Sequence, residues 1–379
     1  MALAYVLKIK AKDEGFTITN YGEYLEKYRS DCEVDIKQAS SWSCFHGVGR
    51  WKEDCGCSTG GHPGWNQKWR KPLRDALDYL RDELVNIYED HGKKYFNNDV
   101  WEVRNKYVDV ILDRGDMNVR KFQQENFLPN LSDEDKVRAM ELLEIQRQSM
   151  LMYTSCGWFF SEISGIETVQ IMKYAARAMQ LAAKFTDKNI EEHFLNILAE
   201  AKSNIPEHGT GKDIFERFVK PSIVTAKQIA SLWALSSLYQ DFEDEEDVYC
   251  YTITKKAYKK VHKGTSTFII GHIEVQSKIT LQKSNLIFAL MQYSGGDFHC
   301  AIKEYSDEAE FNKIKTELIK TYLMNTLTEI IRALDEYFGK EYFTLKDIFI
   351  EERRKILQIL LKGKLCLLYT SDAADDRIS

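Results

Sequence analysis

The chain has 379 residues, of which 44% are hydrophobic and 29% charged, and this apolar content excludes intrinsic disorder for the chain as a whole. There are 52 lysines and arginines against 58 aspartates and glutamates, so the formal charge is −6, which argues against binding to a nucleic-acid backbone. No apolar run reaches the ~20 residues of a membrane-spanning helix and no secretory signal opens the sequence, so we expect a cytoplasmic protein with no membrane partner.

The first third of the chain combines short elements with one long irregular stretch. Residues 1–9 are apolar and begin in mid-pattern without a capping residue, as if a helix were entered partway. Residues 16–20 predict a short strand and residues 21–28 a helix. Residues 31–70 are rich in Cys, Trp, Gly, Ser and His without periodicity, which predicts a long ordered loop region, and loops of that length are usually functional.

A helical domain is predicted over residues 71–240. Its clearest helix starts at Pro72, places apolar residues from Leu73 to Tyr88 on one face and has Gly92 beyond its end. Ser132, with Asp135 three residues later, opens a long helix. Further helices are predicted at about 99–112, 119–127, 132–151, 167–201 and 227–239.

The character of the sequence changes after an acidic run at 241–247, which we interpret as a solvated surface boundary. Residues rich in β-branched and aromatic side chains then predict an antiparallel β subdomain over 241–303, with strands at 248–254, 267–280, 286–293 and 298–302. C-terminal helices are predicted over 304–364, the last of them capped at Thr344. The fold class is therefore α+β, a mainly helical domain followed by a small antiparallel sheet and helices.

The last residues differ from everything before them. Residues 366–376 have no helical or alternating period and resemble a translated sequencing adapter, so we expect 365–379 to be a non-native tail that includes Cys366. The alternative is a frayed native terminus.

Long strings spread over residues 1–364 carry a family resemblance. They are residues 41–51 (SWSCFHGVGRW), 54–57 (DCGC), 59–69 (TGGHPGWNQKW), 152–160, 163–170, 201–209, 297–300 and 349–354. In this order they resemble the carboxy-terminal region, a domain of unknown function, of bacterial proteins related to glycoside hydrolase family 57.

The resemblance implies a two-part enzyme that acts on α-glucans. In that family an amino-terminal β/α barrel carries a glutamate nucleophile and an aspartate acid/base, and a helical domain closes the sugar cleft. By this alignment residues 1–30 are the remnant of the end of the barrel, and both catalytic carboxylates lie upstream of this chain. A retaining glycosidase or glucanotransferase needs two carboxyl groups about 5 Å apart. We therefore expect no catalytic residue here, no hydrolysis by this fragment alone, and the missing barrel as its partner.

The best candidate ligand site is a cluster of tryptophans that could stack on sugar rings of an α-glucan or other oligosaccharide, with polar residues between them for the hydroxyl groups. The predicted substrate-binding residues are Trp42, His46, Arg50, Trp51, Asp54, Trp65, Asn66, Trp69, Trp158, Glu162 and His299. Gly157 stands where the family often has an aspartate before the tryptophan, which puts an acid role there in doubt. The alternative is that these indoles only pack the loop against the helices.

Cys44, His46, Cys55 and Cys57 have ligand types suited to zinc, but the C-x-C spacing makes it harder to place both thiolates on one tetrahedron. We predict no metal and no cofactor, and structural zinc at these four residues is left as the alternative. A nucleophilic Cys44 or Cys156 with a histidine base is a further alternative. The rival function is a noncatalytic carbohydrate-binding or structural scaffold domain, with or without zinc.

Overall fold

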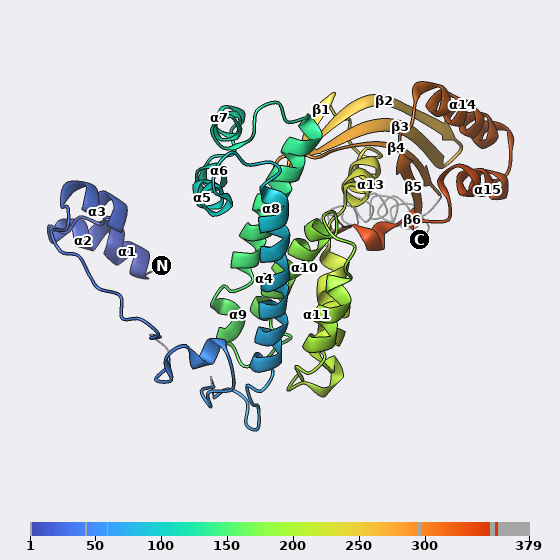
Figure 1. The fold of residues 1–379 in the computed structure, drawn as a ribbon. Helices are drawn as coiled ribbons and strands as arrows, with labels where there is room; N and C mark the ends of the chain where they lie inside the picture. Colours follow the sequence, from blue (N-terminus) through green and yellow to red (C-terminus); the bar gives the residue numbers. More distant parts are fainter. Residues whose placement is uncertain (1, 42–43, 59, 294–296, 349–352, 355–379) are drawn as a thin grey trace, which may run out of the picture. The chain divides into compact units, whose positions relative to one another are not determined.

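The computed structural model describes residues 2–41, 44–58, 60–293, 297–348 and 353–354 (Figure 1). The chain forms two compact units, one up to Arg50 and one from Trp51 onward. The division falls inside a single short 3-10 helix, η2 (Gly47–Trp51), so the chain on either side of it is one continuous local stretch.

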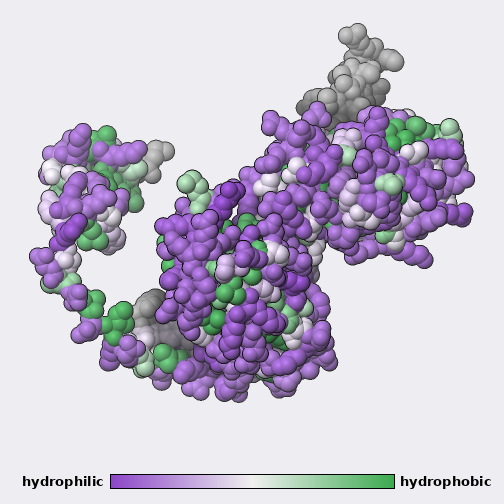
Figure 2. Space-filling model, turned by 45° about the horizontal axis from the view of Figure 1, so that its top comes forward, coloured by the Kyte–Doolittle hydropathy of each residue, from purple (hydrophilic) through white to green (hydrophobic). Residues whose placement is uncertain are grey.

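The first unit consists of short helical segments. They are α1 (Ala2–Tyr5), the π-helical turn η1 (Val6–Lys10), α2 (Ala11–Asp13) and α3 (Tyr21–Lys27). Asn20 caps α3 by accepting a hydrogen bond from the Glu23 amide at 2.9 Å. The strand predicted at 16–20 is wrong, because among the described residues no strand lies beside this stretch to pair with it. No side chain of η1, α2 or α3 is buried, and Figure 2 shows apolar side chains on the surface of this unit.

The second unit begins with the predicted helical domain. Its α-helices are α4 (Arg70–Gly92), α5 (Val100–Lys106), α6 (Val108–Leu112), α7 (Asp116–Asn126), α8 (Asp133–Leu151), α9 (Cys156–Phe159), α10 (Ile166–Ala182), α11 (Ile190–Leu198), α12 (Gly211–Ile214) and α13 (Ala226–Ser236), with short turns η3 (Pro206–His208), η4 (Phe215–Val219) and η5 (Lys220–Ser222). The helix predicted from Pro72 is confirmed as α4. The helix predicted at 99–112 is broken at Tyr107 into α5 and α6, whereas α10 and α11 confirm the prediction of two or three helices over 167–201.

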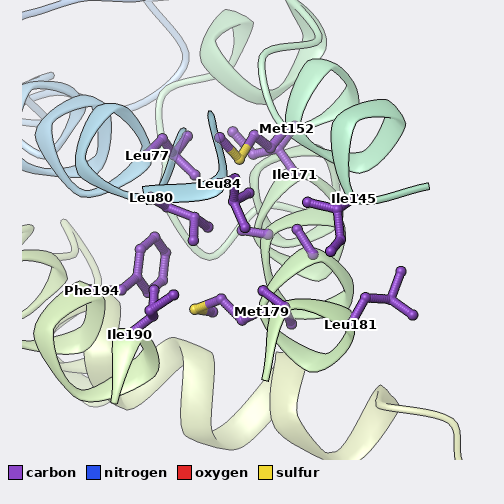
Figure 3. Close-up of a cluster of buried hydrophobic side chains, with 14 of the residues drawn as sticks. Leu77, Leu80, Leu84, Ile145, Met152, Ile171, Met179, Leu181, Ile190 and Phe194 are labelled. Carbon is purple, nitrogen blue, oxygen red and sulfur yellow. The ribbon is translucent and has the colours of Figure 1, made fainter. Parts of the chain in front are cut away.

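Helices α4, α8, α10 and α11 pack around one core (Figure 3). The predicted apolar face of α4 contributes Leu73, Leu77, Leu80 and Leu84, all fully buried. Facing them are residues such as Ile145 of α8, Ile171 and Met179 of α10 and Phe194 of α11. Burial of each side chain of this size contributes about 1.5–3 kcal/mol to the stability of the fold. The helical core is therefore a stable support for the loop that precedes α4.

The sheet has six antiparallel strands in simple sequence order. They are β1 (Glu245–Val248), β2 (Tyr251–Lys263), β3 (Ser266–Ser277), β4 (Lys283–Gln292), β5 (Phe298–Glu304) and β6 (Tyr342–Phe343). The predicted sheet is therefore confirmed, but the strand predicted at 248–254 is divided by a turn at 249–250 between β1 and β2. Part of the acidic run also belongs to the sheet: Glu245–Val248 pairs with β2 as an edge strand, where its carboxylates reach solvent.

Helices cover both faces of this sheet (Figure 1). Trp233 and Ile229 of α13 pack on one face against Phe288. Helices α14 (Glu308–Met324) and α15 (Leu327–Phe338) pack on the other face, against Phe268 and Ile270. The predicted C-terminal helices are thereby confirmed as far as Phe338.

The end of the described chain agrees with the predicted cap. Thr344 forms a capping box with Asp347, and the short turn η6 (Leu345–Asp347) follows. The α-helix predicted from this cap is wrong over its first residues, because η6 ends at Asp347 and the backbone of Ile348 is extended. Of the later residues of that helix the structure describes 353–354, which are helical, and the tail at 365–379 lies outside the described residues. Among the helices that the structure describes, none is long and apolar enough to cross a membrane.

Candidate functional site

The tryptophan-rich loop is fastened to the helical core where it enters α4. Trp69 is 1% exposed, and its indole Nε1 donates a hydrogen bond to the Ser161 carbonyl at 3.4 Å. The guanidinium of buried Arg70 donates to the Phe160 carbonyl at 3.3 Å and lies 5.5 Å from the centre of the Trp69 ring. The Trp69 ring is therefore enclosed by protein in this structure, and it has no free face for a sugar.

Glu162 lies at the centre of a buried hydrogen-bond network. Its carboxylate accepts hydrogen bonds from the Ser203 hydroxyl at 2.6 Å and from the backbone N–H of Asn204 at 2.9 Å. The Asn204 side chain in turn donates to the carbonyls of Asn66 and Ser161, both at 2.9 Å, and accepts from the Asn66 amide at 3.0 Å. The Glu162 carboxylate and the Asn204 side chain thus join three segments that are far apart in sequence. Sequence reasoning missed Ser203 and Asn204, because their partners lie about forty or more residues away.

The other predicted residues of the loop differ in exposure. Trp51 and Trp65 are half-buried, Arg50 is buried, and His46, Asp54 and Asn66 are exposed, whereas Trp42 lies outside the described residues. Trp51 packs against the helical core, and the Trp65 ring is stacked on His62 with centroids 3.9 Å apart. Of the tryptophans described in this loop, Trp51 and Trp65 keep surface that a ligand could contact.

Trp158 is completely buried in the helical core beside a glycine with no room for a side chain. A Cβ atom on Gly157 would lie 2.5 Å from Cδ1 of Ile171 and under 3.0 Å from two further atoms of the same side chain. An aspartate at position 157 would therefore be driven into the core rather than toward a cleft.

Several buried polar atoms near the start of α4 have no hydrogen-bond partner in the described part of the chain. Gln67 is 1% exposed, yet neither its amide nitrogen nor its amide oxygen is paired, and the indole nitrogens of Trp51 and Trp158 are also unpaired. Leaving such a group unpaired costs about 1–3 kcal/mol. Atoms of this kind mark places where water, a ligand or a further polypeptide supplies the partner.

His299 does not lie with the other predicted residues. It is on β5, where its ring contacts Tyr342 at a centroid distance of 3.9 Å, and burial lowers the pKa of its imidazole. The tryptophan loop lies at the opposite end of the helical domain from this sheet (Figure 1).

The structure brings together the four residues that the sequence marked as zinc-compatible. One donor atom each from Cys44, His46, Cys55 and Cys57 lies within 4.8 Å of all the others. Among the described residues, these four are the His, Cys, Asp or Glu side chains whose donor atoms lie close enough together to hold one metal ion.

A cavity of about 820 Å³ lies between α10, the segment before α13 and the ends of β2 and β3, and its lining includes Arg177, Gln180, Ile223, Tyr251 and Ile279. Sequence reasoning missed it, because its walls come from segments far apart in the chain.

The comparisons with known proteins give one match. A family model described as a domain of unknown function (DUF3536) matches residues 65–349. No curated protein and no solved structure matches the chain.

Proposed function

We propose, for a chain that belongs to the DUF3536 family, that it is the cleft-completing part of a larger α-glucan-active enzyme similar to glycoside hydrolase family 57. In this proposal both catalytic carboxylates are supplied by a barrel domain outside the chain. The loop before α4 contributes the sugar-contacting surface, and the helical core holds that loop in place. The single observation that carries the proposal is the apolar surface of the first unit.

That surface is unusually dense for a segment that buries nothing in its own helices. The large apolar side chains exposed between residues 3 and 36 are Leu3, Tyr5, Val6, Leu7, Ile9, Phe16, Ile18, Tyr21, Tyr24, Leu25, Tyr28, Val34 and Ile36. So many exposed large apolar side chains in one short segment favour an interface with another folded element. The element that we propose is the barrel, because the resemblance makes this segment the barrel's last part.

The polar and aromatic groups before α4 support the sugar-facing role. Trp51 and Trp65 offer apolar ring surface, and Asp54 and Asn66 are exposed hydrogen-bonding groups in the same loop. Sugar recognition needs this combination of ring faces and paired donors and acceptors.

The rival function, a scaffold domain without catalytic partners, is favoured by the burial of Trp69 and Trp158. Both indoles are at most 1% exposed and serve the helical core. The two functions differ in what the half-buried tryptophans do, and this difference can be measured.

The proposal is tested by titrating the full chain with malto-oligosaccharides while tryptophan fluorescence and heat are recorded. We expect saturable binding that Trp51→Ala or Trp65→Ala weakens at least tenfold. Trp101→Ala is the matched control, because Trp101 is a half-buried indole on α5, away from the loop. Circular dichroism establishes that each variant is folded.

Two results would overturn parts of the proposal. Absence of binding by the folded chain across α-glucans of different linkage would remove the sugar-facing role. Steady release of reducing sugar by the chain alone would show that the catalytic carboxylates do not lie outside it.

A further inference from the structure

We infer that Cys44, His46, Cys55 and Cys57 form a structural zinc site with three thiolates and one imidazole. The inference is independent of sugar binding, and it assigns His46 to a metal rather than to a substrate. The four residues lie in one continuous local stretch, residues 44–57, in two pairs on either side of η2.

The distances between the donor atoms fit a common ion. All four lie within 4.8 Å of one another. The Cys44 sulfur and Nδ1 of His46 are 3.5 Å apart. With zinc–sulfur bonds of about 2.3 Å and zinc–nitrogen bonds of about 2.0 Å, two ligands of a tetrahedral zinc are separated by about 3.5–3.8 Å. Only small shifts of the remaining side chains are needed to close the tetrahedron.

The local backbone overcomes the objection raised by the C-x-C spacing. Gly56, between the two cysteines, has φ of +79°, a left-handed conformation that favours glycine. Its amide donates to the Asp54 carboxylate at 3.1 Å, which fixes the turn. The reversed chain direction at Gly56 lets the side chains of Cys55 and Cys57 reach the same point.

A second backbone contact holds the sulfur of Cys44 in place. The His46 amide donates a hydrogen bond to the Cys44 sulfur at 3.4 Å, and Cys44 is buried. Hydrogen bonds to a metal ligand orient it toward the ion.

The ligand set identifies both the metal and its role. Three sulfurs and one nitrogen suit zinc and disfavour calcium and magnesium, which require oxygen ligands. Four protein ligands leave no open position for water or substrate, so the site is structural rather than catalytic. A single cysteine with a histidine base would explain Cys44 and His46, but it would not explain two further thiols converging on them.

The first experiment measures the metal in the full chain. Protein purified without chelators is analysed by elemental mass spectrometry, and one zinc per chain is expected. Replacement by Co²⁺ should give the intense visible bands of a tetrahedral ion and a sulfur-to-cobalt charge-transfer band. Protein that holds no zinc after refolding with excess Zn²⁺, and that gives no such bands with Co²⁺, would overturn the inference.

The second experiment identifies the ligands. Cys55→Ser and Cys57→Ser should each lower zinc affinity by at least about 100-fold, whereas Cys32→Ser, at an exposed cysteine outside the cluster, should retain one zinc. His46→Cys should still bind Co²⁺, with a stronger charge-transfer band from a fourth thiolate. This gain of signal does not depend on a variant that fails to fold. Equal zinc loss in Cys32→Ser, or a Cys55–Cys57 disulfide found by mass spectrometry in freshly purified reduced-buffer protein, would contradict the assignment.

Discussion

At the scale of single residues, Glu144 is a buried charge held by several hydrogen bonds in the helical core. It is 2% exposed on α8, and its carboxylate accepts hydrogen bonds from the Tyr107 hydroxyl at 2.6 Å, Arg114 at 2.8 Å and Arg147 at 3.2 Å. Burial alone would raise the pKa of this carboxyl, but the hydrogen bonds from Tyr107 and Arg114, with the charge of Arg147, lower it below its ordinary 4.5. The folded protein therefore favours ionised Glu144 more strongly than the unfolded chain does.

Replacing this carboxylate should destabilise the protein in a pH-dependent way. Glu144→Gln is expected to lower the free energy of unfolding by about 2–3 kcal/mol at pH 7, because charge-assisted hydrogen bonds are lost. Since the folded-state pKa is the lower one, the stabilisation is fully present above pH 4.5 and disappears as the pH falls through the folded-state value. Urea unfolding at several pH values measures this, with the exposed Glu134→Gln on the same helix as control. A difference between wild type and variant that stays constant down to pH 3 would contradict it.

Gly157 gives a second prediction at this scale. Gly157→Ala should lower the free energy of unfolding by about 1–3 kcal/mol, because the added Cβ overlaps the stiff, branched side chain of Ile171. Gly157→Asp should cost more, because it also buries a carboxylate. Thermal unfolding of both variants is compared with Ser155→Ala, an exposed change in the same segment. If aspartate were tolerated as well as alanine, position 157 would face a cleft after all.

At the scale of elements, Asn204 joins the loop before α4 to the segment after α9. Asn204→Ala removes the three side-chain hydrogen bonds to Asn66 and Ser161. We expect the free energy of unfolding to fall by about 2–4 kcal/mol. Proteolysis should then cut the loop at 51–69 faster than in the wild type, because the loop has lost one of its attachments. Asn312→Ala, at an exposed site on α14, should change neither property. Equal cleavage rates in the two variants would show that other contacts, such as those of Trp69 and Arg70, hold the loop without Asn204.

The elements themselves could be predicted where local patterns decide them. The apolar face of α4, the Ser132 cap of α8 and the β-branched and aromatic content of β3 and β4 are set by neighbouring residues, and these predictions are confirmed. The strand at 16–20 failed because pairing needs a partner that no local pattern provides. Strand β1 was missed because it is an edge strand, paired on one side only, and its charged side chains reach solvent instead of forming an apolar pattern.

The candidate site was less accessible to sequence reasoning for the same reason. Whether Trp69 stacks on a sugar or packs in a core depends on Ser161 and Phe160, ninety or more residues away. The Cys and His cluster was visible as a composition, but the spacing argued against zinc until the left-handed backbone of Gly56 was known. The residue types of the site could be read from the sequence. The exposure of each tryptophan and the approach of the Cys and His side chains to one another could be known only from the fold.

At the scale of the whole molecule, the exposed apolar residues of the first unit should make the chain self-associate when the proposed barrel is absent. Sedimentation velocity over a concentration series should show a rising average mass. Leu7→Glu combined with Leu25→Glu should restore a monomer, because charges at these exposed positions oppose apolar contact. Asn312→Glu with Thr316→Glu makes the same charge change on the exposed face of α14 and should leave association unchanged. A wild-type chain that stays monomeric at all concentrations with its helices intact would mean that this segment needs no partner, and the proposed interface with a barrel would fall with it.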